Sequence, residues 1–171
     1  MAATFTKIAT TTVGSGGSAT IEFTSISSSY TDLQLNLSAR GTSTALYAKI
    51  EFNGSSAANY SLRTIYGEGT GGTASQSDSG AAFFERFLMN SSAYTTSTFS
   101  NSMLYIPNYA GSNNKSVMFD SVDETNAGAV PMYMVAGLWA QTAAITSIKL
   151  TPNTGNFAEF STATLYGIKN S

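Results

Sequence analysis

The sequence contains no histidine and no cysteine among its 171 residues, and only 11% of its residues are charged. Histidine and cysteine are the usual bases, nucleophiles and metal ligands at neutral pH, so thiol chemistry, histidine-assisted nucleophiles and the common zinc and copper sites are excluded. Without cysteine, disulfides cannot contribute to stability. These absences favour a protein that binds or assembles over an enzyme.

The charge of the chain is low and nearly balanced. Eight basic and ten acidic residues give a formal net charge of −2, and the basic residues are scattered singly. A nucleic-acid-binding protein needs a basic patch to replace phosphate counterions, so we expect no nucleic-acid partner. No apolar run approaches the roughly 18 residues of a membrane span, and the start of the chain lacks the features of a signal peptide. We therefore expect a soluble chain made in the cytoplasm, with no membrane partner.

Apolar and polar residues alternate through much of the chain. The clearest alternation lies in residues 31–40, with apolar side chains at Leu33, Leu35, Leu37 and Ala39. This period of two is typical of a half-buried antiparallel strand. Further strands are predicted at residues 21–23, 46–52, 59–66, 99–106, 116–122, 132–139, 145–150 and 157–168. About ten strands without a long helix predict a single domain (1–171), an all-β antiparallel β-sandwich with a jelly roll as the preferred arrangement.

Three segments depart from this pattern. Residues 1–13 are predicted to form an N-terminal arm that adds to a neighbour's sheet or, more simply, an edge strand of their own sheet. Residues 67–80 are rich in Gly, Ser and Thr and are predicted to form a long mobile loop. Residues 81–90 are predicted to form a strand or one short helix. Their aromatic side chains are expected in the core or, alternatively, in an exposed partner contact: Phe83, Phe84 and Phe87.

One acidic cluster, Asp120, Asp123 and Glu124, is a candidate for metal binding. Carboxylate oxygens at this spacing can hold calcium, but the calcium-loop motif is missing, so a solvated strand end or a partner-facing ion pair is favoured. The other acids form no recognisable motif for glycoside hydrolysis, and the serines have no histidine base. The tyrosines and Trp139 are suited to stacking on sugars, and equally to packing in the sandwich or at an interface. We expect no catalytic residue, no metal and no cofactor.

Several short segments spread over most of the chain carry a resemblance. They are IEFTSI (21–26), YTDL (30–33), IEFNG (50–54), YIPNYAG (105–111), AGLW (136–139), AITSI (144–148) and ATLYGI (163–168). As a set they resemble small structural proteins of tailed bacteriophages, especially phages of cyanobacteria and other aquatic bacteria. None of these segments is a catalytic fingerprint, so the resemblance concerns a type of domain rather than a mechanism.

The resemblance implies a virion protein with a β-sandwich, assembled as homotrimers or by the symmetry of the particle. It implies a decoration (cement) protein made in the host cytoplasm, which binds the major capsid protein on the outer surface of the head. The alternative is a receptor- or carbohydrate-binding domain of a tail fibre or spike. The chain has no visible fibre shaft, which favours decoration. Partner contacts are expected in the loops and at the chain start, at Phe5, Lys7, Arg86 and Tyr109.

Overall fold

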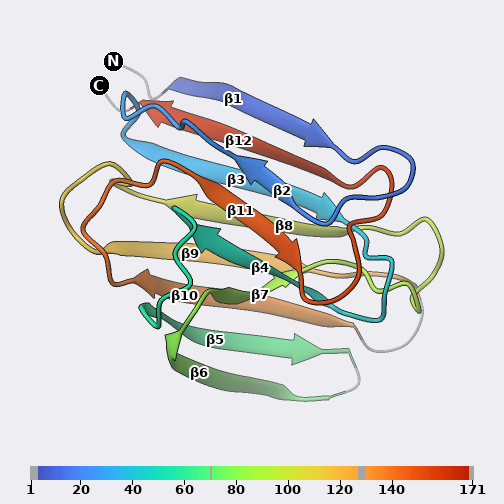
Figure 1. Cartoon of the computed structure of the whole chain (residues 1–171). Helices are drawn as coiled ribbons and strands as arrows, with labels where there is room; N and C mark the ends of the chain where they lie inside the picture. Colours follow the sequence, from blue (N-terminus) through green and yellow to red (C-terminus); the bar gives the residue numbers. More distant parts are fainter. Residues whose placement is uncertain (1–3, 70, 127–129, 170–171) are drawn as a thin grey trace.

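The computed structural model describes residues 4–69, 71–126 and 130–169, and these residues form twelve β-strands in two antiparallel sheets (Figure 1). The predicted all-β fold with two packed sheets is thereby confirmed. Within the described ranges, no helix is long and apolar enough to cross a membrane.

The larger sheet has eight strands, each paired with its neighbours in antiparallel register. Their spatial order is β1 (Thr4–Thr12), β12 (Thr162–Lys169), β3 (Asp32–Ala39), β8 (Ser100–Ile106), β9 (Lys115–Val122), β10 (Pro131–Trp139), β5 (Tyr60–Glu68) and β6 (Thr73–Ala81). Strands β1 and β6 are therefore the two edges of this sheet.

The smaller sheet has four strands and covers one face of the larger sheet (Figure 1). Their order is β2 (Ile21–Phe23), β11 (Ile148–Pro152), β4 (Tyr47–Phe52) and β7 (Phe84–Leu88). Strand β7 contacts β5, β8, β9 and β10, so it fixes the smaller sheet over the centre of the larger one. The opposite face of the larger sheet has no covering layer among the described residues.

An aromatic cluster fills the core between the two sheets. Trp139 is 2% exposed, and its ring centroid lies 5.5 Å from that of Phe52 in the smaller sheet. Phe84 and Phe87 are completely buried, which confirms their predicted place in the core, whereas Phe83 is only half-buried and lies outside it. The ring of Phe84 packs directly against Gly137, where an added Cβ would lie only 2.7 Å from a ring carbon. The two sheets therefore share one core.

The topology departs from the prediction in the number and division of the strands. The described residues contain twelve strands instead of about ten. The sheets have eight and four strands, whereas the usual jelly roll has eight strands in two sheets. The jelly-roll arrangement is therefore not established by this strand order.

The prediction of a mobile loop at residues 67–80 was wrong. Strand β5 continues to Glu68, and the edge strand β6 begins at Thr73; residue 70 lies outside the described residues. Strand β6 is exposed from Thr73 to Gly80. An edge strand in solvent on both faces needs no apolar alternation, so its Ser- and Thr-rich sequence gave no strand signal.

The other two irregular segments are also strands. Residues 4–12 form β1, which pairs with β12 of the same chain, so the edge-strand alternative for residues 1–13 is confirmed. Residues 1–3 lie outside the described residues. Residues 84–88 form β7, so the strand alternative holds for the phenylalanine-rich segment.

Candidate protein-binding surface

Strand β10 shows how the chain builds an unusual surface. Its residues alternate strictly between buried and exposed from Pro131 to Trp139. A strand with one face in solvent normally carries polar side chains on that face. In β10 the outward positions are instead apolar: Met132, Met134, Ala136 and Leu138. Both faces of this strand are therefore built as if they were covered.

The neighbouring strands extend this apolar surface. Opposite Met134, strand β5 places Ile65, and both side chains are 62% exposed. Strand β9 adds Met118 and Val122 on its other side. We call this surface the methionine patch; it consists of Ile65, Met118, Val122, Met132, Met134 and Leu138. Monomeric soluble proteins rarely leave a contiguous apolar patch of this kind in water.

Two open hollows indent the methionine patch. One, of about 450 Å³, is lined by Ile65, Met118 and Met132. The second, of about 480 Å³, adjoins it along β5 and β6 and is lined by Arg63 and Met134. Hollows between flexible methionines suit the side chains of a docked protein, because methionine adapts its shape to an irregular partner.

Two charged side chains, Arg63 and Asp120, lie within this part of the face. Arg63 on β5 is exposed and donates a hydrogen bond to the backbone carbonyl of Leu62 at 3.0 Å. Asp120 on β9 lies between Met103 and Met134 in the strand register. Neither residue has an ion-pair partner among the described residues.

The rest of the outward face is polar but carries few charges. Gln34 donates a hydrogen bond to Asn36 at 3.0 Å on β3, and the Tyr105 hydroxyl donates to Asp32 at 2.8 Å. These side chains satisfy one another along β3 and β8. The outward face therefore has an apolar half over β9, β10 and β5 and a polar half over β1, β12 and β3.

The structure places two of the four predicted contact residues on the polar half of this face. Phe5 is 57% exposed at the start of β1, and its ring packs edge-on against Tyr166 at 6.5 Å between centroids. Lys7, two residues along the same strand, is exposed. Both are accessible to a partner, and their role in partner contact stays a prediction.

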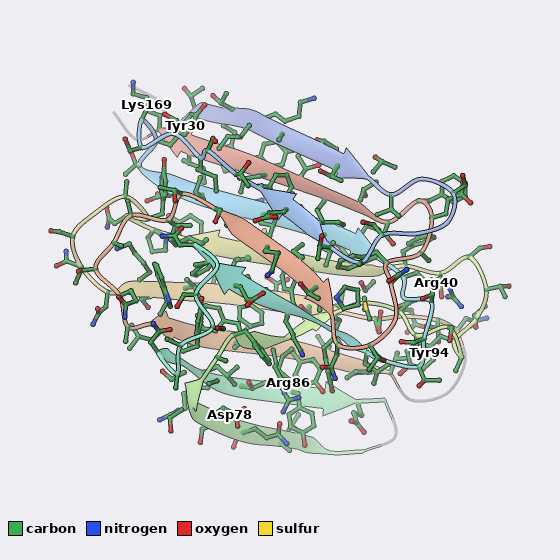
Figure 2. All side chains as sticks on the ribbon, viewed as in Figure 1. Tyr30, Arg40, Asp78, Arg86, Tyr94 and Lys169 are labelled. Carbon is green, nitrogen blue, oxygen red and sulfur yellow. The ribbon has the colours of Figure 1, made fainter. Side chains whose placement is uncertain are left out.

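The other two predicted contact residues lie elsewhere. Tyr109 is completely buried, and its hydroxyl donates a hydrogen bond to the Ser27 carbonyl. Arg86 on β7 is held at 5.2 Å over the Tyr47 ring and donates a hydrogen bond to Gln76 of β6 at 2.8 Å (Figure 2). Arg86 therefore fastens the end of the smaller sheet to the edge of the larger one. The four residues do not form one site.

The acidic cluster does not converge on a metal site. Asp120 belongs to the outward face, whereas Asp123 is buried and Glu124 is exposed. Within the described part of the chain, no three acidic side chains are close enough to hold a metal ion. Both carboxylate oxygens of Asp123 lack a hydrogen-bond partner, and burial raises the pKa of this carboxyl to about 7.

The methionine patch was missed in the sequence, although a signal was present. The segment from residue 130 to 140 (VPMYMVAGLWA) is apolar without interruption. A continuous apolar run predicts a strand that is buried on both faces, whereas an alternating run predicts one buried face. The prediction for residues 132–139 named a strand but did not include the apolar side chains on its second face.

Comparison of the chain with known proteins found no match. No protein-family model, no curated protein and no solved structure matches the chain.

Proposed function

We propose that the protein is a non-enzymatic structural protein of a phage virion, and that it binds other protein through the outward face of its larger sheet. In this proposal it is a decoration protein that binds the major capsid protein on the outer surface of the head. By bridging subunits of the shell, it stabilises the head against rupture.

The exposed methionine patch is the observation that supports a binding role. Its six apolar side chains are between 37% and 62% exposed and lie together on three adjacent strands. Burying such side chains contributes roughly 25 cal/mol per Å² of apolar area, so contact with a partner is favoured over exposure to water. The virion setting comes from the resemblance in the sequence.

Binding to shells tests the proposal. Purified chain is added to mature phage capsids that lack it, and the capsids are then sedimented and heated. We expect saturable binding and a higher rupture temperature. The variant Met134→Glu places a charge at the centre of the patch and is expected to lose binding. The matched control, Glu22→Arg, changes an exposed residue on the smaller sheet and is expected to bind normally.

Two results would contradict the proposal in different ways. Binding to bacterial cells or surface glycans instead of shells would assign the chain to the tail fibre or spike. Shell binding that survives Met134→Glu would show that the methionine patch is not needed for attachment to the shell.

A further inference from the structure

We propose that the methionine patch is covered by a second copy of this chain, in a face-to-face pair with two-fold symmetry. This inference rests on the proposed function, because it names the occupant of the surface on which that function depends. It is carried by the placement of charge in the patch and by the area of the face.

The two charged residues beside the methionine patch, Arg63 and Asp120, lie at opposite corners of a block formed by β5, β10 and β9. The strand register defines the block. It consists of two rows, Ile65–Met134–Asp120 and Arg63–Ala136–Met118. Each corner on the other diagonal is apolar, and the middle strand β10 contributes the two apolar residues at the centre.

The geometry of a sheet keeps Arg63 and Asp120 apart within one chain. Neighbouring strands are about 4.8 Å apart, and successive residues on one face are about 6.8 Å apart. Two strands and one such step place the two backbone positions about 12 Å apart. This separation agrees with the lack of an ion pair between them in the described residues. Each charge is therefore available to a partner.

A two-fold axis along the apolar diagonal brings the charges together. This axis lies in the plane of the face and runs from Ile65 to Met118, so it places Arg63 of each copy opposite Asp120 of the other. Ile65 and Met118 meet their own counterparts on the axis, and Met134 packs between them. Two ion pairs then flank an apolar centre, which is the self-complementarity that a two-fold interface requires. The strands cross steeply, as in orthogonal sheet packing.

The apolar half, together with the flanking strands β8 and β6, has enough area for a stable pair. Five strands, from β8 to β6, span about 24 Å, and a nine-residue strand is about 30 Å long. The projected area is therefore about 700 Å², close to the roughly 800 Å² per partner of a standard protein interface. Methionines are enriched at such interfaces, whereas most charged residues are depleted.

A two-fold pair differs from the trimer that the resemblance implies, because a flat face covered by one copy leaves no room for another. The polar half of the face, with Phe5 and Lys7, lies beyond the paired block. The pair would present this half twice. Two linked binding surfaces raise the effective concentration at the second site, which strengthens attachment to a repeating shell.

Sedimentation of the full chain in the absence of shells tests the pair. We expect a species of twice the 17.9 kDa chain mass that dissociates on dilution. Arg63→Asp and Asp120→Arg each place like charges opposite one another, and each is expected to raise the dissociation constant about tenfold or more. The double variant Arg63→Asp/Asp120→Arg exchanges the charges and is expected to restore pairing. Glu22→Arg serves as the control, and melting curves confirm that each variant folds.

Three outcomes would overturn the pair: a monomer at every concentration, a trimer, or a double variant that fails to recover. Failure of the pair and failure of the proposed decoration role give different results. A monomer that still binds shells overturns the pair and retains the decoration role. If the chain pairs but does not bind shells, the pair is supported and the decoration role is overturned.

Discussion

The two outward faces of the sandwich are built from opposite kinds of side chain. On the smaller sheet, Glu22, Lys149 and Glu51 form a row across three strands, and Lys149 and Glu51 make an ion pair at 2.8 Å. On the larger sheet, the corresponding central positions are methionines with exposed fractions above one half. Both faces cover the same core, so the core does not require this difference.

Of the two outward faces, that of the smaller sheet has the side chains expected of a surface in contact with water. Charged side chains on a strand keep a surface solvated and discourage association. The smaller sheet follows this rule, with Lys49 also lying 4.6 Å over the Phe83 ring and shielding it. The larger sheet breaks the rule over β9, β10 and β5. Surfaces that break a local rule in this way are expected at functional sites.

Both outward faces lie over one shared core, so a substitution in that core is expected to have the largest effect on the free energy of unfolding. Trp139→Ala should lower the free energy of unfolding by roughly 3 to 5 kcal/mol, because Trp139 is buried against Phe52 and Tyr60. Denaturant unfolding measures this loss. An unchanged midpoint, or separate transitions for the two sheets, would contradict a common core.

A second prediction concerns the end of the methionine patch, where Asp123 follows β9. Its pKa is raised from 3.8 to about 7 by burial, so the folded state holds a proton that the unfolded state releases. Stability is therefore greatest below about pH 4 for this group and falls by roughly 2 to 4 kcal/mol as the pH rises to about 7. Asp123→Asn should remove this part of the pH dependence, as measured by denaturant unfolding between pH 4 and 8. An identical pH profile in the variant would refute it.

Two adjacent residues of β10, Val135 and Met134, allow effects on folding stability and on self-association to be measured separately. Val135 is completely buried, and Val135→Ala should cost about 2 kcal/mol of folding stability. Met134 faces outward, and Met134→Ala should change the stability of the unpaired chain by less than about 0.5 kcal/mol while weakening self-association. Melting of dilute protein measures the first effect, and sedimentation measures the second. Equal losses of folding stability would place Met134 in the core.

The smallest effect is expected on the charged face. Hydrogen bonding to Glu51 raises the pKa of Lys149, but a partly exposed ion pair contributes little to stability. Glu51→Gln should therefore cost less than about 1 kcal/mol and leave self-association unchanged. A loss of pairing in this variant would show that the smaller sheet, too, contributes to the interface.

Part of this structure could be predicted from the sequence. Strands such as β3 and β9 have one covered face, so period-two alternation identified them. Strand β6 has no covered face and gave no such signal. Lys115 was grouped with the scattered basic residues, but it is buried with its ammonium donating hydrogen bonds to the carbonyls of Gly111 and Asn113. The ammonium also donates a hydrogen bond to the carbonyl of Thr142 at 3.3 Å, and a contact with so distant a segment is not revealed by sequence patterns.

The candidate surface was harder to predict than the fold. Phe5 and Lys7 were chosen from their position near the chain start, and both are exposed. The apolar run of β10 signals an apolar second face, but the full methionine patch arises only when β5 and β9 are placed beside this strand. Sequence patterns describe each strand, whereas a surface depends on the order of the strands in the sheet.

The most direct test of the outward face as a protein contact is peroxide oxidation of its methionines, followed by mass spectrometry. Oxidation rates of Met118, Met132 and Met134 are compared in dilute chain, in concentrated chain and on shells, with the fully buried Met89 as internal control. The account predicts rapid oxidation of the three residues in dilute chain, strong protection in the other two samples, and slow oxidation of Met89 throughout. Equal, rapid oxidation of the three in all samples would contradict it.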